Sequence, residues 1–150
     1  MKMDYHDIDI LFVEDNLDDA KLTIRALKKS GLANKLHHVK DGAESLDFIY
    51  CRGAYASRSK IQNLKLILLD LKMPKLSGIE VLATIKADPT TRSIPVVILT
   101  SSKEDPDIRE CYALGVNSYI VKPVEGKNFF HAIRDLGLYW MVLNEPNTGD

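Results

Sequence analysis

The sequence predicts an α/β fold in which a central parallel sheet of five strands carries helices on both faces. The first observation is a set of short apolar runs with no polar residue alternating through them, such as residues 66–69 and 96–99. Runs of this kind are typical of parallel strands that are buried on both faces. The second observation is that strand signals alternate five times with helix signals along the chain. That alternation favours right-handed crossovers, and therefore a parallel sheet between two helical layers.

Length and composition are those of one globular domain. The chain has 150 residues, 45% of them hydrophobic and 27% charged, so we expect a single domain over residues 1–150 with its core at about 8–143. A net charge of −1 gives no basic footprint for nucleic acid. The N-terminus lacks the apolar stretch of a signal peptide, and no apolar run approaches the ~20 residues that cross a bilayer. We therefore expect a cytoplasmic protein that binds neither nucleic acid nor membrane, with Cys51 and Cys111 as free thiols.

Each expected strand is a short apolar run that ends near a turn residue or a polar group. The second run is the weakest, and Asp41 and Gly42 close it. Pro95 precedes the fourth run, and Lys122 and Pro123 end the fifth. In chain order, the strands are expected at residues 8–13, 36–39, 66–69, 96–99 and 118–121.

Five helices are expected where apolar residues recur at steps of three and four. Gly31 is a natural stop for the first helix, and Pro89 lies just beyond the third. Asp105 is expected to cap the fourth helix, with Pro106 at its first position. The residues that predict the helices, in chain order, are Leu17, Ala20, Ile24 and Leu27; Leu46, Ile49 and Tyr50; Gly78, Val81, Leu82 and Ile85; Ile108, Cys111, Tyr112 and Gly115; and Phe129, Ile133, Leu136, Trp140 and Leu143.

One segment, residues 51–63, is irregular. It contains Arg52, Arg58 and Lys60 but no acidic residue, together with Gly53 and two serines. We expect it to extend the second helix and then to return to the third strand, either as a solvated loop or as a loop that binds a partner.

Polar side chains that can bind ligands or take part in a reaction stand at the ends of four expected strands. Glu14 and Asp15 end the first strand, Asp70 the third, Thr100 the fourth and Lys122 the fifth. Parallel strands end at one edge of the sheet, where open α/β sheets keep their ligands. The three acids could therefore converge on one divalent cation, and that ion and the Lys122 ammonium would balance their charge. Oxygen ligands without His or Cys favour Mg²⁺ or Mn²⁺ over zinc.

A cation beside a carboxylate suits the capture of a phosphoryl group. Asp70 can be the in-line nucleophile, Thr100 can donate a hydrogen bond, and Lys122 can neutralise charge on the phosphoryl oxygens. Each residue also has an ordinary explanation when it is taken alone. Asp15 could cap the first helix, Thr100 could be a strand-end hydroxyl, and Lys122 could be a surface amine.

These residues and their neighbours resemble the receiver domain of bacterial two-component response regulators. The resemblance runs from about Ile8 to Leu143 and implies a flavodoxin-like (βα)5 fold with strand order 2-1-3-4-5. The motifs that carry it are Glu14-Asp15, Asp70-Leu71-Lys72-Met73-Pro74 with Gly78, Thr100-Ser101-Ser102 and Tyr119-Ile120-Val121-Lys122-Pro123.

The resemblance assigns a role to each of these positions. It implies that Asp70 accepts a phosphoryl group from a histidine kinase. Glu14, Asp15 and the backbone carbonyl of Lys72 would hold Mg²⁺ together with Asp70. Lys122 would pair with the phosphoryl oxygens, and the Lys122–Pro123 bond would be cis.

The resemblance also implies a switch rather than an enzyme in the ordinary sense. Thr100 would move toward the phosphoryl group, and Tyr119 would turn inward into the space that it leaves. The change would reshape the face formed by the fourth helix, the fifth strand and the fifth helix, through which the chain would signal to a protein target. The chain would catalyse only its own phosphotransfer and dephosphorylation, and no output domain is expected.

Two further features resemble regulators associated with bacteriophytochrome-type kinases: the 51–63 segment and a last helix that continues to residue 143. Leu138, Met141 and Val142 fall off the apolar stripe of that helix. Exposed apolar surface often marks an interface, so we expect a homodimer through the last two helices.

Three alternatives remain at this stage. The chain could be a degenerate receiver that acts as a constitutive interaction module. It could be a Mg²⁺-dependent phosphatase with an aspartyl-phosphate intermediate, but that chemistry wants a second acid where Lys72 stands. A flavin site would need a loop that cradles phosphate, whereas residues 14–19 hold four acids that would repel it. His37 and His38 would alternate faces on a strand, so we do not expect them to form a ligand pair.

Overall fold

The computed structural model describes residues 8–29, 36–58, 64–73, 75–116 and 118–137. It contains one five-stranded sheet whose order is β2-β1-β3-β4-β5, and every neighbouring pair is parallel. The predicted fold class and strand order are therefore confirmed. The strands are β1 (Ile10–Val13), β2 (Leu36–Val39), β3 (Leu66–Asp70), β4 (Val96–Thr100) and β5 (Ser118–Val121).

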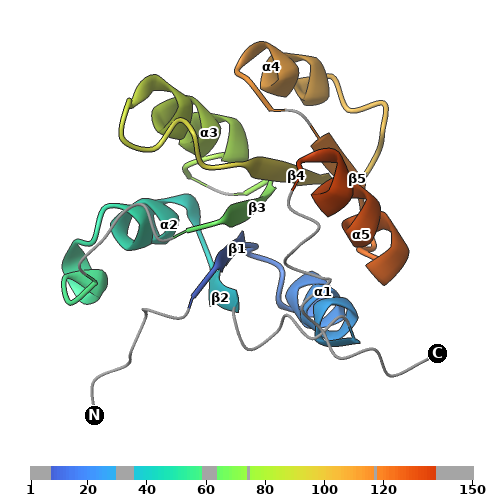
Figure 1. Ribbon diagram of the computed structural model, residues 1–150, viewed down its shortest axis with the longest axis horizontal. Coiled ribbons are helices and arrows are strands. Elements are labelled where there is room, and N and C mark those ends of the chain that lie inside the picture. Colours follow the sequence, from blue (N-terminus) through green and yellow to red (C-terminus); the bar gives the residue numbers. More distant parts are fainter. Residues whose placement is uncertain (1–7, 30–35, 59–63, 74, 117, 138–150) are drawn as a thin grey trace.

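Helices cover both faces of the sheet (Figure 1). On one face lie α1 (Leu17–Lys29) and α5 (Gly126–Asp135), which pack against each other and on β1, β3 and β4. The other face carries α2 (Gly42–Ile49), α3 (Gly78–Ala87) and α4 (Asp107–Ala113). Each helix presents its apolar stripe to the sheet, as the periodicity of the sequence predicts.

The core has two parts, one on each face of the sheet, because successive side chains of a strand point to opposite faces. Every residue of β1, β3 and β4 is buried. Leu11 and Val13 pack on the face of α2, α3 and α4, whereas Ile10 and Phe12 pack on the face of α1 and α5. No polar residue interrupts these strands before Asp70 and Thr100, which are their last residues.

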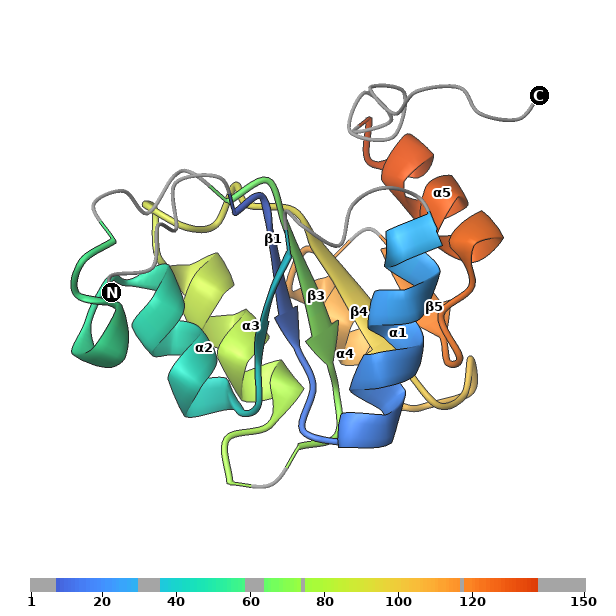
Figure 2. The same ribbon diagram turned by 90° about the horizontal axis from the view of Figure 1, so that it is seen from below.

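The carboxyl ends of the strands meet at one edge of the sheet. In Figure 2 the arrowheads of β1 and β3 point to the same edge, where α1 begins directly after β1. Val13 pairs with both Val39 and Leu69, so β1 and β2 end level and β3 ends one residue beyond them, at Asp70. No helix in the described part of the chain is both long and apolar enough to cross a membrane.

The 51–58 segment differs from the prediction. It does not extend the second helix, because α2 ends at Ile49 and Cys51 has a left-handed backbone with φ of 57°. A short 3-10 helix, η2 (Gly53–Tyr55), follows. The segment is not simply a solvated loop either, since Tyr55 and Arg58 are buried. Residues 59–63 lie outside the described residues.

Side chains of the core anchor this segment. The Tyr55 hydroxyl donates to Glu44 Oε2 at 2.6 Å and lies 2.9 Å from His37 Nε2. Arg58 Nε donates to the Phe48 carbonyl oxygen at 2.8 Å, and its guanidinium lies 4.2 Å from the centre of the Phe48 ring. The segment therefore forms a fixed extension of the layer that contains α2.

The two histidines of β2 lie on opposite faces of the sheet, as expected. The ring of His37 stacks on Phe48, whereas the ring of His38 lies beside Phe12. Phe48 and Phe12 belong to the cores on the two different faces. These histidines therefore form no ligand pair.

The start of α4 and the end of α5 can be compared with the boundaries that the sequence predicts. Asp105 Oδ1 accepts a hydrogen bond from the Asp107 N–H at 2.9 Å, as expected of a capping side chain. The predicted start of the helix is one residue too early, because Pro106 precedes α4 and the helix begins at Asp107. The structure describes α5 as far as Asp135. The predicted stop at Gly31 and the apolar residues expected beyond residue 137 lie outside the described residues.

Candidate functional site

Four of the five strand-end residues singled out by the sequence line one pocket, and Thr100 does not. Its volume is about 250 Å³, and its wall brings together the ends of β1, β3 and β5 and the start of α1. Thr100 ends the neighbouring strand β4, and the next residue, Ser101, lines the pocket. The lining residues are Glu14, Asp15, Asn16, Asp19, Asp70, Lys72, Ser101 and Lys122.

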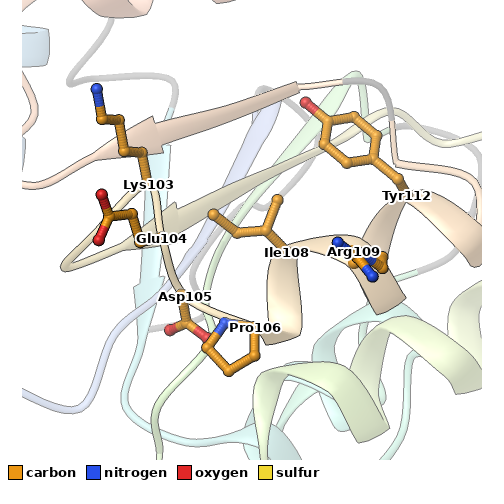
Figure 3. A pocket seen from close by; sticks show the side chains of 7 residues that line it. All are labelled: Lys103, Glu104, Asp105, Pro106, Ile108, Arg109 and Tyr112. Atoms are coloured by element: carbon orange, nitrogen blue, oxygen red, sulfur yellow. The ribbon is translucent and has the colours of Figure 1, made fainter.

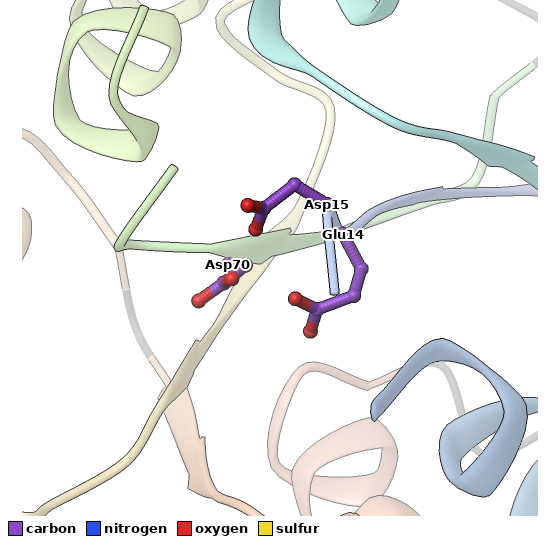
Figure 4. Close-up of side chains that lie close together, drawn as sticks. All are labelled: Glu14, Asp15 and Asp70. Carbon is purple, nitrogen blue, oxygen red and sulfur yellow. The ribbon is translucent and has the colours of Figure 1, made fainter. Parts of the chain in front are cut away.

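Three carboxylates gather at the centre of this pocket (Figure 4). Glu14, Asp15 and Asp70 each offer one oxygen, and the three oxygens lie within 4.8 Å of one another. Glu14 is fully buried and Asp70 is 3% exposed, whereas Asp15 is exposed to solvent. Hard oxygen ligands in this arrangement fit a magnesium or manganese ion.

The turn after β1 explains why Asp15 faces the pocket. Asn16 caps α1, because its Oδ1 accepts a hydrogen bond from the Asp19 N–H at 2.9 Å. The Asn16 N–H in turn donates to Glu14 Oε2 at 3.2 Å. The alternative that Asp15 caps the helix is therefore wrong, and its carboxylate is left to line the pocket.

Lys122 is held among carboxylates and is not a surface amine. Its Nζ lies 2.8 Å from Glu14 Oε1, 3.1 Å from Asp19 Oδ2 and 3.3 Å from Asp70 Oδ2. Burial disfavours the ammonium, but the contact with Glu14 and the charge of Asp70 outweigh burial and raise the pKa of Lys122. The Lys122–Pro123 peptide bond is cis, as the resemblance implied.

Glu14 shows that the pocket has too little positive charge for its carboxylates. Burial, and then the neighbouring Asp70 carboxyl, raise the pKa of Glu14 to about 7 although Lys122 acts in the opposite direction. Among the described residues, the buried Oε1 has the Lys122 ammonium at 2.8 Å as its ionic partner and no further hydrogen-bond donor. Three carboxylates beside one ammonium leave an excess of negative charge, which is costly where it is buried, and a divalent cation would balance that excess.

Thr100 is buried, but its hydrogen bonds remain within the loop that follows β4. Its Oγ1 lies 3.1 Å from the Ser102 carbonyl oxygen and 3.3 Å from Asp105 Oδ2. The Ser102 N–H donates back to Oγ1 at 3.3 Å. The hydroxyl is therefore fully engaged on the side of α4.

Lys72 extends away from the centre of the pocket toward the start of α4. Its Nζ donates to Asp107 Oδ2 at 3.0 Å and lies 3.9 Å from Asp105 Oδ2. Its backbone N–H donates to Asp70 Oδ1 at 3.3 Å. This ammonium stands where a phosphatase of the aspartyl-phosphate type would need an acid.

The structure adds two side chains that the sequence did not predict as neighbours of the site residues. Asp19 reaches Lys122 from the first turn of α1, and the Asp105 side chain reaches Thr100 in addition to capping α4. The acid-rich run at residues 14–19 was a signal for Asp19. Which acid of that run faces Lys122, however, depends on the rotation of α1. Nothing in the sequence signals the second.

The outer face of α4, β5 and α5 carries two shallow hollows. A pocket of about 660 Å³ lies along the start of α4, between Lys103 and Tyr112 (Figure 3). A second, of about 320 Å³, lies between β5 and α5 and includes Tyr119 and His131. Tyr119 is half-buried, and its ring meets that of Tyr112 edge-on with the ring centres 6.3 Å apart.

Comparison with known families gives one match that covers most of the chain. A family model described as the response regulator receiver domain matches residues 10–134. Among curated proteins, the response regulator Rcp1 of Synechocystis sp. is 37% identical over 132 residues, which are 88% of this chain and 88% of Rcp1.

Solved structures give the same result. The bacteriophytochrome response regulator RtBRR is 50% identical, covers 95% of this chain and 85% of its own, and superposes with a TM-score of 0.83. The Mn²⁺-bound form of Rcp1 covers 95% of this chain and 99% of its own at 34% identity, with a TM-score of 0.71. The phosphorylated cyanobacterial phytochrome response regulator RcpA covers 94% and 99% at 37% identity, also with a TM-score of 0.71.

Proposed function

Because the chain belongs to the response regulator receiver family, we propose that Asp70 accepts a phosphoryl group from a histidine kinase in a Mg²⁺-dependent reaction. One observation carries the proposal: three carboxylates and one half-buried ammonium meet in a single pocket at the ends of the strands. The Mn²⁺-bound form of Rcp1 and the phosphorylated form of RcpA support it, since both are similar to this chain along nearly its whole length.

The proposed step is an in-line displacement at phosphorus. An oxygen of the Asp70 carboxylate attacks the phosphorus of a phosphorylated imidazole, the P–N bond breaks, and its electron pair returns to the imidazole ring. Lys122 already lies 3.3 Å from Asp70 Oδ2, so its ammonium can pass to a phosphoryl oxygen with little movement. A divalent cation held by Glu14, Asp15, Asp70 and the Lys72 carbonyl would neutralise the charge on the phosphoryl oxygens.

The reaction needs no separate catalytic base, because the nucleophile is a carboxylate. According to this proposal, the chain is a phosphoacceptor that catalyses its own phosphotransfer and its own dephosphorylation. The geometry disfavours the alternative of a phosphatase, since the Lys72 ammonium takes the position of the second acid and pairs with Asp107.

The direct test is to incubate the chain with a small-molecule phosphodonor and Mg²⁺ and to measure covalent labelling. We expect labelling of the wild type, a complete loss in Asp70→Asn, and normal labelling in Asp18→Asn. Asp18 is a matched control because it is an exposed acid in the first turn of α1, near the pocket, and does not line it. Equal labelling of Asp70→Asn would contradict the assignment. A wild type that binds Mg²⁺ but never becomes labelled would favour the interaction module.

We also propose a partner and an output surface. The 50% identity with RtBRR favours a kinase of the bacteriophytochrome type, acting in the cytoplasm. Phosphotransfer profiling against the histidine kinases of the source organism tests this, and preferential transfer from a kinase of another type would contradict it.

The output surface that we propose is the face of α4, β5 and α5, with Thr100 and Tyr119 as the switch residues. The two hollows on this face offer places for a protein target, and the same face would carry a homodimer. Sedimentation over a concentration series, with and without a phosphoryl mimic, should show a dimer. A monomer at every concentration would count against the dimer and leave the phosphotransfer unaffected.

A further inference from the structure

Asp105 has a nearly buried carboxylate to which the phosphotransfer chemistry assigns no role. It stands directly before Pro106 at the start of α4 (Figure 3), and its side chain is 6% exposed. Oδ1 caps the helix through the Asp107 N–H. Oδ2 instead faces Thr100 Oγ1 at 3.3 Å and Lys72 Nζ at 3.9 Å. A carboxylate at that depth needs partners for both oxygens. Of the two partners of Oδ2, Thr100 is nearer than Lys72.

The Thr100 hydroxyl has only one proton to give. Two acceptors lie within reach of it, the Ser102 carbonyl oxygen at 3.1 Å and Asp105 Oδ2 at 3.3 Å. A hydrogen bond to an ionised acceptor is stronger than one to a neutral acceptor. A phosphoryl group on Asp70 would therefore compete mainly with Asp105 for this proton.

We propose that Asp105 is a positioning residue that holds the Thr100 hydroxyl in the β4–α4 loop until a phosphoryl group on Asp70 outcompetes it. The proposal rests on the proposed function, in which Thr100 moves from the β4–α4 loop to the phosphoryl group on Asp70. When Thr100 leaves, Asp105 Oδ2 keeps the Lys72 ammonium as a partner, so its carboxylate is not stranded. Asp105 would thus set how strongly the unphosphorylated arrangement is favoured.

The test compares the affinity of variants for beryllofluoride, a phosphoryl mimic, in saturating Mg²⁺. In Asp105→Asn the amide oxygen can still cap α4, but the charge that attracts the Thr100 proton is gone. We expect the affinity to rise by about tenfold, which is the effect of about 1.4 kcal/mol. Asp107→Asn is the matched control, because it removes one charge two residues further along, at the first residue of α4, whose side chain contacts Lys72 and not Thr100. We expect less than a twofold change there.

A second pair of variants separates positioning from simple charge repulsion. If Asp105 acts through the Thr100 hydroxyl, then Asp105→Asn should change nothing once Thr100→Val has removed that hydroxyl. A tenfold gain that persists with Thr100→Val, or that Asp107→Asn reproduces, would overturn the proposal. An unchanged affinity in the single variant Asp105→Asn would overturn it too.

A measurement without any phosphoryl mimic keeps this inference separate from the proposed function. Three-bond couplings of the Thr100 side chain report its rotamer in the free protein. We expect one rotamer in the wild type and in Asp107→Asn, and averaging between rotamers in Asp105→Asn. A single unchanged rotamer in Asp105→Asn would contradict the positioning role, whatever the labelling of Asp70 shows.

Discussion

At the scale of single residues, Glu14 governs the electrostatics of the pocket. Its carboxyl is fully buried, lies against Asp70, and has a pKa raised to about 7. Between its ordinary value of 4.5 and about 7, the folded chain binds a proton at Glu14 that the unfolded chain does not bind. The contribution of Glu14 to the free energy of unfolding therefore falls as the pH rises through this window.

A divalent cation should reverse this trend, because it binds the deprotonated carboxylate. We expect Mg²⁺ to raise the midpoint of thermal unfolding more at pH 8 than at pH 5.5, with thermal scans at fixed ionic strength as the measurement. In Glu14→Gln, which carries no charge at either pH, the difference between the two pH values should shrink. An equal effect of Mg²⁺ on the wild type at both pH values would contradict this account.

At the scale of elements, the junction between β3 and α3 fixes the position of Asp70. The Gly78 N–H donates to the Leu71 carbonyl oxygen at 3.1 Å, and a Cβ at Gly78 would overlap the carbonyl oxygen of Asp70. Ser77 and Glu80 form a capping box at the same point, so α3 begins directly against the end of β3. The backbone that carries Asp70 thus has little freedom to move.

Replacing Gly78 with alanine should therefore force the new Cβ against the Asp70 backbone, so that one of the two segments must shift. We expect Gly78→Ala to lower the free energy of unfolding by about 1–3 kcal/mol, which is typical of overpacking, and also to slow the labelling of Asp70. Urea denaturation measures the first effect. Gly126→Ala is the control, since Gly126 likewise begins a helix, and we expect a change within about 0.5 kcal/mol there. Equal stabilities of Gly78→Ala and wild type would refute the overlap.

The elements also show where sequence reasoning succeeds and where it stops. Buried strands and amphipathic helices follow from periodicity, so the sheet, its helices and the polar strand ends of Glu14, Asp70 and Lys122 could be predicted. The end of α2 could not, because Cys51 adopts a left-handed backbone that glycine usually adopts. The roles of Asp19 and Asp105 depend on helix rotation and loop path, which only tertiary packing decides.

At the scale of the whole molecule, the pocket and the outer face are linked through the loop after β4. Thr100 ends β4 at the pocket, and its hydroxyl bonds to the loop that leads into α4. Tyr112 of α4 meets Tyr119 of β5 edge-on. A movement of Thr100 toward Asp70 would therefore disturb α4 and β5 first, while α2 and the 51–58 segment are anchored separately.

Amide hydrogen exchange can map this expected path. With beryllofluoride and Mg²⁺, we expect faster exchange at Ser102, whose N–H loses Thr100 Oγ1 as its acceptor, and altered exchange in α4 and β5. Exchange in α2 should stay the same, because no hydrogen bond of Thr100 reaches it. Changes confined to α2 and α3 would contradict the path. Asp70→Asn, treated in the same way, should show no change anywhere.

The turn between β1 and α1 has a consequence for how this chain can vary. Within six positions, Glu14 pairs with Lys122, Asp15 belongs to the three-carboxylate cluster, Asn16 caps the helix, and Asp19 reaches Lys122. The position of each of these side chains depends on the number of residues that separate it from the end of β1. Inserting or deleting one residue here would change the spacing between the groups that follow β1 and those that α1 carries, so we expect this turn to tolerate some exchanges of side chain but no change of length.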